Sequence, residues 1–146
     1  MKKIKIFSPA TVSNVACGFD ILGFPIESFG DEMVISKSDK KGVRITKVEG
    51  YLVPIDSKKN VASVSAQKLV KDLKPNCGFD IEIKKNIIPG SGIGSSGSNA
   101  AGSVFAINKL LGEPLSAKKL IKYAMRGEAA SSLTEHPDNV APALLG

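Results

Sequence analysis

A run of glycines and serines between residues 89 and 99 carries the clearest chemical signal in the sequence. Gly90, Gly92 and Gly94 alternate with other residues, and two serines follow directly. Glycine readily adopts left-handed backbone conformations, so backbone N–H groups can turn inward around an anion. A helix beginning at the serines would add unpaired N–H groups and the positive end of its dipole. This segment therefore predicts a phosphate-binding loop, with a plain strand-to-helix turn as the alternative.

The glycine spacing separates this loop from two common nucleotide-binding motifs. No Lys-Ser or Lys-Thr pair follows the glycines, as a Walker A motif requires. The G-x-G-x-G spacing also differs from the Rossmann fingerprint, and the sequence shows no regular alternation of strands and helices to frame one. The loop therefore belongs to a third class of nucleotide-binding segment.

Two further clusters of polar residues could bind a small polar substrate. Asn14 and Asp20 flank a stretch of small residues, while His136, Asp138 and Asn139 lie near the C-terminal end. A carboxylate can bind an ammonium group, and an amide both donates and accepts hydrogen bonds. Ordinary structural explanations also exist: Asn14 can form a turn, a lone histidine is usually a surface or core residue, and the segment from residue 137 to 139 can be a turn followed by a helix cap.

The patterns around these residues predict a mixed fold. Apolar residues that alternate predict strands, and apolar residues three or four apart predict helices. Strands are predicted over 2–7, 33–36, 43–48 and 79–84, with a loop over 8–18 and an apolar stretch over 19–26. Helices are predicted from an N-cap at Asn60 to about residue 73, from an N-cap at Ser95 or Ser96 to about residue 111, and from an N-cap at Ser116 to about residue 127. This order of elements makes the chain α+β.

Composition narrows the class of partner. The 146 residues carry a net charge of +6, but the lysines are spread along the chain and aromatic residues make up only 5%. A base-stacking surface for nucleic acid is therefore poorly supplied. The sequence contains no run of about 18 apolar residues, which is the length that a membrane-spanning helix needs. Cys17 and Cys77 form no C-x-x-C pair and are expected to be reduced thiols. We expect a cytoplasmic protein with an anionic small-molecule ligand.

Three motifs, taken in order along the chain, resemble the GHMP kinase superfamily and, within it, the homoserine kinase family. The first joins Pro9-Ala-Thr-Val-Ser-Asn14 to Gly18-Phe-Asp-Ile-Leu-Gly23, the second is Gly92-Ile-Gly-Ser-Ser96, and the third is His136-Pro-Asp-Asn-Val-Ala-Pro142. The resemblance covers residues 1–146 but only the first half of the family's usual length. It implies a ribosomal protein S5 domain 2-like N-terminal domain, with a C-terminal ferredoxin-like domain missing. The chain would then be a fragment of one about twice as long.

The same resemblance implies a reaction, in which the γ-phosphoryl group of ATP passes to the side-chain hydroxyl of L-homoserine. The product, O-phospho-L-homoserine, lies on the route to threonine. Mg²⁺ would be held by Ser96 and Glu128, whose hard oxygen atoms suit that ion, although a solvated helix-end carboxylate is the plainer explanation of Glu128. No residue is assigned as general base, and Asp138 is the candidate by type.

Binding residues follow from the resemblance in the same way. The homoserine ligands would be Asn14, Asp20, His136, Asp138 and Asn139. The ATP ligands would be Asn60, Val61, Pro89, Gly90, Ser91, Gly92, Ile93, Gly94, Ser95, Ser96, Gly97, Ser98 and Asn99. Lys84 or Lys85 could neutralise a phosphate, and a solvated position explains these lysines equally well.

Other functions stay open from the sequence. Another GHMP kinase, such as one of the mevalonate pathway, would share the loop, and a basic nucleic-acid-binding module of S5-like fold would share the fold and charge. We expect L-homoserine and ATP as partners, without nucleic acid or membrane, and a homodimer is left open. The isolated half is expected to bind nucleotide weakly at best, without catalysing the reaction.

Overall fold

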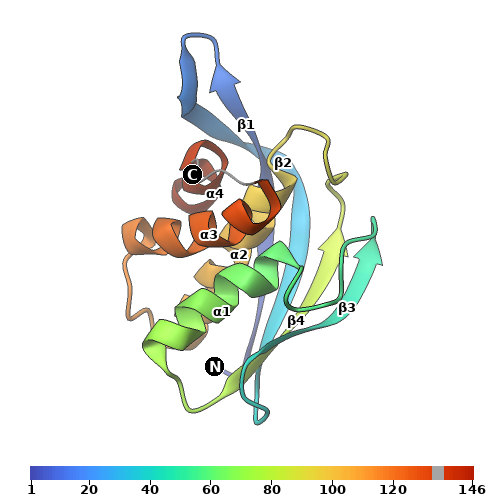
Figure 1. Cartoon of the computed structure of the whole chain (residues 1–146), viewed down its shortest axis with the longest axis vertical. Coiled ribbons are helices and arrows are strands. Elements are labelled where there is room, and N and C mark those ends of the chain that lie inside the picture. Colours follow the sequence, from blue (N-terminus) through green and yellow to red (C-terminus); the bar gives the residue numbers. More distant parts are fainter. Residues whose placement is uncertain (133–136) are drawn as a thin grey trace.

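The computed structural model describes residues 1–132 and 137–146, apart from the side chains of residues 20 and 128–132. Four strands form one sheet in the order β1-β2-β4-β3, and the helices of the described chain lie against one face of it (Figure 1). The strands are β1 (Lys3–Val15), β2 (Gly18–Ser38), β3 (Val43–Gly50) and β4 (Gly78–Lys85). The helices are α1 (Val61–Leu73), α2 (Ser95–Leu110), α3 (Ala117–Ser132) and α4 (Pro137–Leu145).

The predicted α+β class is confirmed, with one addition. β1 and β4 both pair antiparallel with β2, but β3 and β4 are parallel. Parallel neighbours need a crossover connection, and α1 supplies it. The chain therefore contains one β-α-β unit that the sequence analysis missed. The glycine-rich loop follows this unit and leads from β4 into α2.

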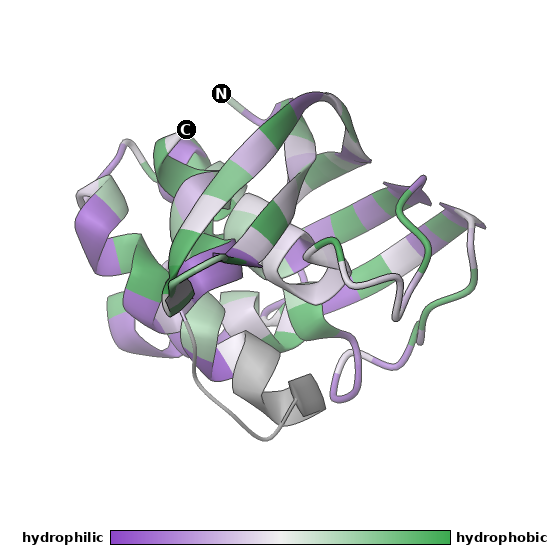
Figure 2. Cartoon of the chain, turned by 90° about the horizontal axis from the view of Figure 1, so that it is seen from above, coloured by the Kyte–Doolittle hydropathy of each residue, from purple (hydrophilic) through white to green (hydrophobic). Residues whose placement is uncertain are grey.

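The core lies between the sheet and the helices. Side chains of a strand alternate between its two faces, so the odd-numbered residues over 31–35 of β2 and 79–85 of β4 point to the helices and the even-numbered ones to the open face. Met33, Ile35, Ile81 and Ile83 are accordingly buried. Figure 2 shows this alternation as green and purple bands along the strands. Burying each of these side chains contributes about 1.5–3 kcal/mol to the free energy of folding.

The first strand is longer than predicted, and the loop predicted over residues 8–18 is wrong. β1 continues to Val15, and the register of its pairing with β2 shifts between Pro9 and Thr11 and again between Ser13 and Val15. β1 is an edge strand, where a proline and bulges are tolerated because one side makes no ladder hydrogen bonds. The stretches predicted separately over 19–26 and 33–36 form the single strand β2.

The strands predicted over 43–48 and 79–84 are confirmed as β3 and β4, as is the helix after Asn60. The Asn60 side chain accepts a hydrogen bond from the N–H of Ala62 at 3.1 Å, as an N-cap should. The predicted serine cap of α2 is wrong: its N-cap is Gly94, whose backbone is left-handed. α3 runs five residues past its predicted end at about Gly127, to Ser132.

Three further sequence-based predictions concern the start of α4, the two cysteines and the length of the helices. The segment beginning at Pro137 forms the first turn of α4 rather than a turn followed by a cap. Cys17 and Cys77 are both free thiols, as expected. Within the described residues, no helix has the length and apolar character needed to cross a membrane.

Candidate functional site

The glycine-rich loop connects the end of β4 to the start of α2 over residues 86–94. Gly90, Gly92 and Gly94 have φ angles of 79°, 80° and 68°, a left-handed conformation that residues with a side chain rarely adopt. Apart from the glycine itself and its two chain neighbours, no described residue has an atom within 4 Å of the position that a Cβ would take at Gly90 or Gly92. The middle of the loop is therefore open, and its backbone leads directly into the unpaired N–H groups of α2.

The end of the loop is fixed against two distant segments. A Cβ at Gly94 would overlap the Thr11 hydroxyl and would lie 2.8 Å from the side-chain oxygen of Asn139. The Thr11 N–H donates to the carbonyl of Ile93 at 3.1 Å, and its hydroxyl donates to Asn139 Oδ1 at 2.8 Å. Asn139 in turn donates to the Ser13 hydroxyl at 3.1 Å. β1, α4 and the loop therefore meet at one point.

A pocket of about 220 Å³ opens beside this loop. Apolar side chains form part of its wall, and a few hydroxyl, amide and ammonium groups converge on it, as in sites for small organic anions. Its lining residues are Val53, Pro54, Lys59, Asn60, Val61, Lys85, Pro89, Ser95, Ser96 and Asn99. The pocket thus brings together six of the predicted ATP ligands, two from the start of α1 and four from the loop and α2.

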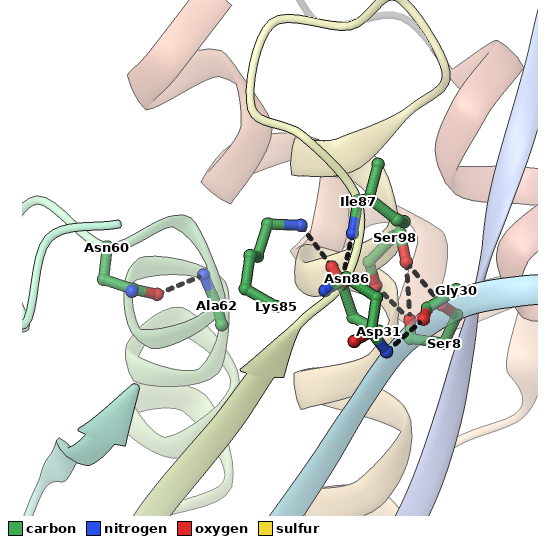
Figure 3. Close-up of polar contacts among 9 residues, drawn as sticks. All are labelled: Ser8, Gly30, Asp31, Asn60, Ala62, Lys85, Asn86, Ile87 and Ser98. Atoms are coloured by element: carbon green, nitrogen blue, oxygen red, sulfur yellow. Dashed lines mark hydrogen bonds and ion pairs between the residues drawn. The ribbon is translucent and has the colours of Figure 1, made fainter. Parts of the chain in front are cut away.

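A buried ion pair lies under the start of the loop. Asp31 of β2 and Lys85 of β4 face each other, and both side chains are almost completely buried (Figure 3). The second oxygen of Asp31, Oδ1, accepts hydrogen bonds from the N–H groups of Asn86 at 2.7 Å and Ile87 at 2.9 Å. The side chain of Asn86 donates to the carbonyl of Gly30 at 2.9 Å. Burial lowers the pKa of the Lys85 ammonium group, and the hydrogen bond to Asp31 opposes that change.

The two lysines named from the sequence lie on opposite faces of the sheet. Lys84 points to the open face, where it pairs with Glu32 at 3.2 Å. Lys85 points to the helix-covered face and lines the pocket. Only Lys85 of these two can approach a ligand in the pocket.

Residues of α2 divide between the pocket and the core. Ser98 is buried, and its hydroxyl donates to the carbonyl of Ser8 at 2.9 Å, so this side chain joins α2 to β1 rather than facing the pocket. Asn99 lies on the pocket wall and is 5% exposed. Its Oδ1 has no hydrogen-bond partner, the one such buried side-chain atom identified in the described residues. A buried acceptor of this kind needs a partner, and a ligand could supply it.

The two predicted substrate clusters approach each other across the fold. Asn14 is exposed near the end of β1, at the register shift between Ser13 and Val15, and its backbone is left-handed with a φ of 58°. Its neighbour Ser13 accepts the hydrogen bond from Asn139 described above. Asp138 is 5% exposed in the first turn of α4, where the helix dipole favours a negative charge. The backbone carbonyl of Asp138 lies so close to Gly23 of β2 that a Cβ on Gly23 would overlap it.

Three predicted site residues lie outside what the structure describes. His136 is not described at all, and for Asp20 in β2 and Glu128 in α3 only the backbone is. Among the described residues, no group of three or more histidine, cysteine, aspartate or glutamate side chains could hold a metal ion. The predicted magnesium pair of Ser96 and Glu128 remains a prediction.

The sequence analysis missed Asp31 and Thr11. Asp31 precedes the buried residues Met33 and Ile35 in the same odd-numbered series, and Lys85 continues the series of Ile81 and Ile83. Extending the alternation by one step would have placed both charged groups on the buried face. No comparable signal marks Thr11, because its position depends on the bulges in β1.

Comparison with known proteins agrees with this geometry. The family model described as GHMP kinases N terminal domain matches residues 60–146, which is more than half of the chain and includes the loop, α2 and α4. The chain belongs to the GHMP kinase family. The predicted membership is therefore confirmed, and the loop between β4 and α2 lies within the matched region.

Individual members of the GHMP kinase family match the whole chain. The homoserine kinase of Chloroherpeton thalassium is 42% identical over 100% of this chain and 50% of that protein. The crystal structure of homoserine kinase from Cytophaga hutchinsonii superimposes with a TM-score of 0.94 and 45% identity, covering 100% of this chain and 47% of that one. A mevalonate kinase of L. major in complex with R-mevalonate matches at 20% identity and a TM-score of 0.76, which shows a shared fold alone. The chain spans about half the length of the curated relatives it matches.

Proposed function

We propose that this chain is the nucleotide-binding half of a homoserine kinase, which transfers the γ-phosphoryl group of ATP to the side-chain hydroxyl of L-homoserine. The observation that carries the proposal is the junction of Gly94, Thr11 and Asn139. It joins the end of a phosphate-type loop to the two segments that resemble the homoserine-binding motifs. The identity of 42–45% to homoserine kinases over the whole chain supports this choice of substrate.

In this proposal the pocket binds the adenine end of the nucleotide and the loop binds its phosphates. The apolar wall near Val53 and Val61 would pack against the adenine ring, and Asn60 would lie beside it. The loop backbone and the N-terminus of α2 would bind the phosphates, which carry negative charge. The open space at Gly90 and Gly92 leaves room for that close approach. A rotation of the Asn99 amide would offer its unpartnered oxygen to a donor group of the ligand.

Mg²⁺ would be bound at the start of α2. Ser96 lines the pocket with a hydroxyl group, a hard oxygen donor that suits this ion, and Glu128 would supply a carboxylate. The ion, when bound, neutralises phosphate charge during transfer. Phosphoryl transfer depends mainly on positioning and charge, so these side chains need only hold the γ-phosphoryl group in line with the substrate hydroxyl.

The substrate would lie where the hairpin meets α4. Asn14, Asp20, His136, Asp138 and Asn139 are its proposed ligands, as carried over from the motifs. We assign Asp138 to substrate binding rather than to general-base catalysis. Asp138 lies in the first turn of α4, and a carboxylate there can bind the ammonium group of an amino acid.

The rival functions have weaker support. The mevalonate kinase match extends only to the fold, because its sequence identity is low. A nucleic-acid surface would need clustered positive charge. The open face of the sheet instead pairs its lysines with acids, as in Lys47 with Glu49 at 2.5 Å and Lys5 with Glu32 at 2.5 Å.

Chemical-shift mapping by NMR tests the proposal on the chain itself. We expect MgATP to shift the backbone signals of residues 86–99, and L-homoserine added afterwards to shift those of residues 13–14 and 138–139. Mevalonate serves as the matched control and is expected to leave the second set unchanged. Shifts with mevalonate but not homoserine would overturn the choice of substrate, and RNA binding without any response to MgATP would support the nucleic-acid alternative.

A further inference from the structure

The Asp31–Lys85 ion pair is unusually well buried for two charged groups. Asp31 is 0% exposed and Lys85 is 1% exposed. Removing two charges from water costs free energy that their attraction only partly returns, so such a pair is a poor way to stabilise a fold. Its position directly under the candidate phosphate-binding loop indicates another role.

The pair is connected to the loop through backbone hydrogen bonds. One oxygen of Asp31 faces Lys85, while the other accepts from the N–H groups of Asn86 and Ile87, the first two residues of the loop. Figure 3 shows these contacts converging on the Asp31 carboxylate at the end of β4. The far end of the loop is fixed separately, by the hydrogen bond from Thr11 to Ile93. Both ends of the loop are therefore held, and the open glycines lie between them.

We propose that Asp31 and Lys85 are positioning residues for the phosphate-binding loop. Lys85 orients the carboxylate, and Asp31 fixes the first two amides, so that the loop has its binding conformation before the nucleotide arrives. A loop ordered in advance loses less conformational entropy on binding, and affinity rises accordingly. This inference rests on the nucleotide-binding function proposed above and assigns to it two residues that act through the loop backbone.

A matched control lies one residue away on the same two strands. Glu32 and Lys84 form an ion pair at 3.2 Å on the open face, where their side chains are 29% and 55% exposed. No loop amide bonds to Glu32 in the described structure. Glu32→Gln therefore changes the same charge on the same strand without touching the loop.

The experiment measures two quantities for each variant: the hydrogen-exchange rates of the Asn86 and Ile87 amides by NMR, and the dissociation constant for MgATP by titration. For Asp31→Asn we expect exchange about tenfold faster or more at both amides. The new side chain has only one oxygen, and the unpaired Lys85 ammonium group competes with the two amides for it. We also expect MgATP binding to weaken about tenfold. For Glu32→Gln both quantities should stay within about twofold of the parent values.

A second variant keeps the test decisive if Asp31→Asn leaves Lys85 unpaired and the chain fails to fold. Asp31→Asn combined with Lys85→Met removes both charges and retains an amide oxygen that can accept from the loop. We expect this double variant to fold, with amide protection and MgATP affinity restored to within about threefold of the parent. A double variant with restored protection but weak binding would show that Lys85 acts on the nucleotide directly, and would overturn the inference.

Other outcomes are equally clear. Faster amide exchange in Asp31→Asn with unchanged MgATP affinity would mean that loop order does not matter for binding, and the inference would be wrong. Weaker binding with unchanged exchange would also contradict it. If the parent chain binds no MgATP although both amides are protected, the proposed function fails instead.

Discussion

Two ion pairs, Asp31–Lys85 and Glu32–Lys84, join the same two strands one residue apart, yet their surroundings differ completely. The first lies under the helices and is closed off from water, whereas the second lies on the open face. The Glu32 carboxylate pairs with both Lys84 and Lys5, and it makes no hydrogen bond to the loop in the described structure. The pleat of the sheet alone separates the two pairs.

This contrast shows how one chemical motif serves two purposes. The exposed pair adds charge to a solvated surface and contributes little to stability. The buried pair holds a loop, and each of its members depends on the other, because an unpaired charge there would be very costly. The helix-covered face is therefore where small changes in sequence should have large effects.

The largest expected effect comes from truncating the buried carboxylate. Asp31→Ala leaves Lys85 without its partner and two loop amides without an acceptor, so the free energy of unfolding should fall by about 3–5 kcal/mol. Glu32→Ala should leave the urea midpoint nearly unchanged, because its lysine partners are solvated. Urea denaturation followed by circular dichroism measures both. An equal loss of unfolding free energy in the two variants would contradict the difference drawn between the two faces of the sheet.

The next largest effect is a difference in stability between two glycine substitutions in the loop, one at an open position and one at a packed position. Gly92→Ala and Gly94→Ala both place a side chain on a left-handed residue, which costs about 1–2 kcal/mol. At Gly94 the new Cβ also overlaps Thr11, so Gly94→Ala should destabilise by about 1–3 kcal/mol more than Gly92→Ala. Thermal unfolding of the two variants provides the comparison. If Gly92→Ala lowered the thermal stability more than Gly94→Ala, the description of Gly92 as open and Gly94 as packed would be contradicted.

A smaller effect is expected at the N-cap of α1 on the pocket wall. Asn60→Ala removes the acceptor for the Ala62 N–H and should cost about 1 kcal/mol of stability. Asn60→Asp keeps this acceptor and loses only the hydrogen bond from the side-chain amide to the Pro54 carbonyl, at 2.7 Å. It should therefore be the more stable of the two in chemical denaturation. The reverse order would mean that the Pro54 contact, not the cap, is the important one.

The smallest effect concerns acid sensitivity on the open face. Hydrogen bonds from Lys5 and then Lys84 lower the pKa of Glu32 below its usual value of 4.5. A carboxyl group with a lowered folded-state pKa stabilises the protein above its unfolded pKa, and that contribution disappears as the pH falls through the folded value. Between neutral pH and about pH 4 the parent and Glu32→Gln should respond alike, and below about pH 4 the parent should lose slightly more stability. Urea midpoints across this range measure the difference.

Much of this fold follows from alternation and capping in the sequence. The pattern of Ile81 and Ile83 is enough to place β4, and Asn60 is enough to begin α1. β1 could not be delimited in the same way, because its second half contains small and polar residues whose strand conformation depends on pairing with β2. The cap of α2 was missed because the backbone of Gly94, rather than a side chain, ends the loop.

The candidate site was predictable in parts but not as a whole. Its phosphate-type loop follows from glycine chemistry, and the structure gives those glycines the expected left-handed conformation. The approach of Asn139 to Thr11 and Ser13 depends on tertiary packing, which no local pattern encodes. The roles of Asp20, Glu128 and His136 remain predictions from the motifs.

The hydrogen bond between Thr11 and Asn139 also sets an order of events during synthesis. Its two residues are 128 positions apart, so the first strand leaves the ribosome long before the helix that completes its corner of the site. At typical elongation rates this interval is on the order of ten seconds. Towards the end of that time β1 and the residues that line the pocket, 53–99, are already made, whereas the α4 residue that joins β1 to the end of the loop is not.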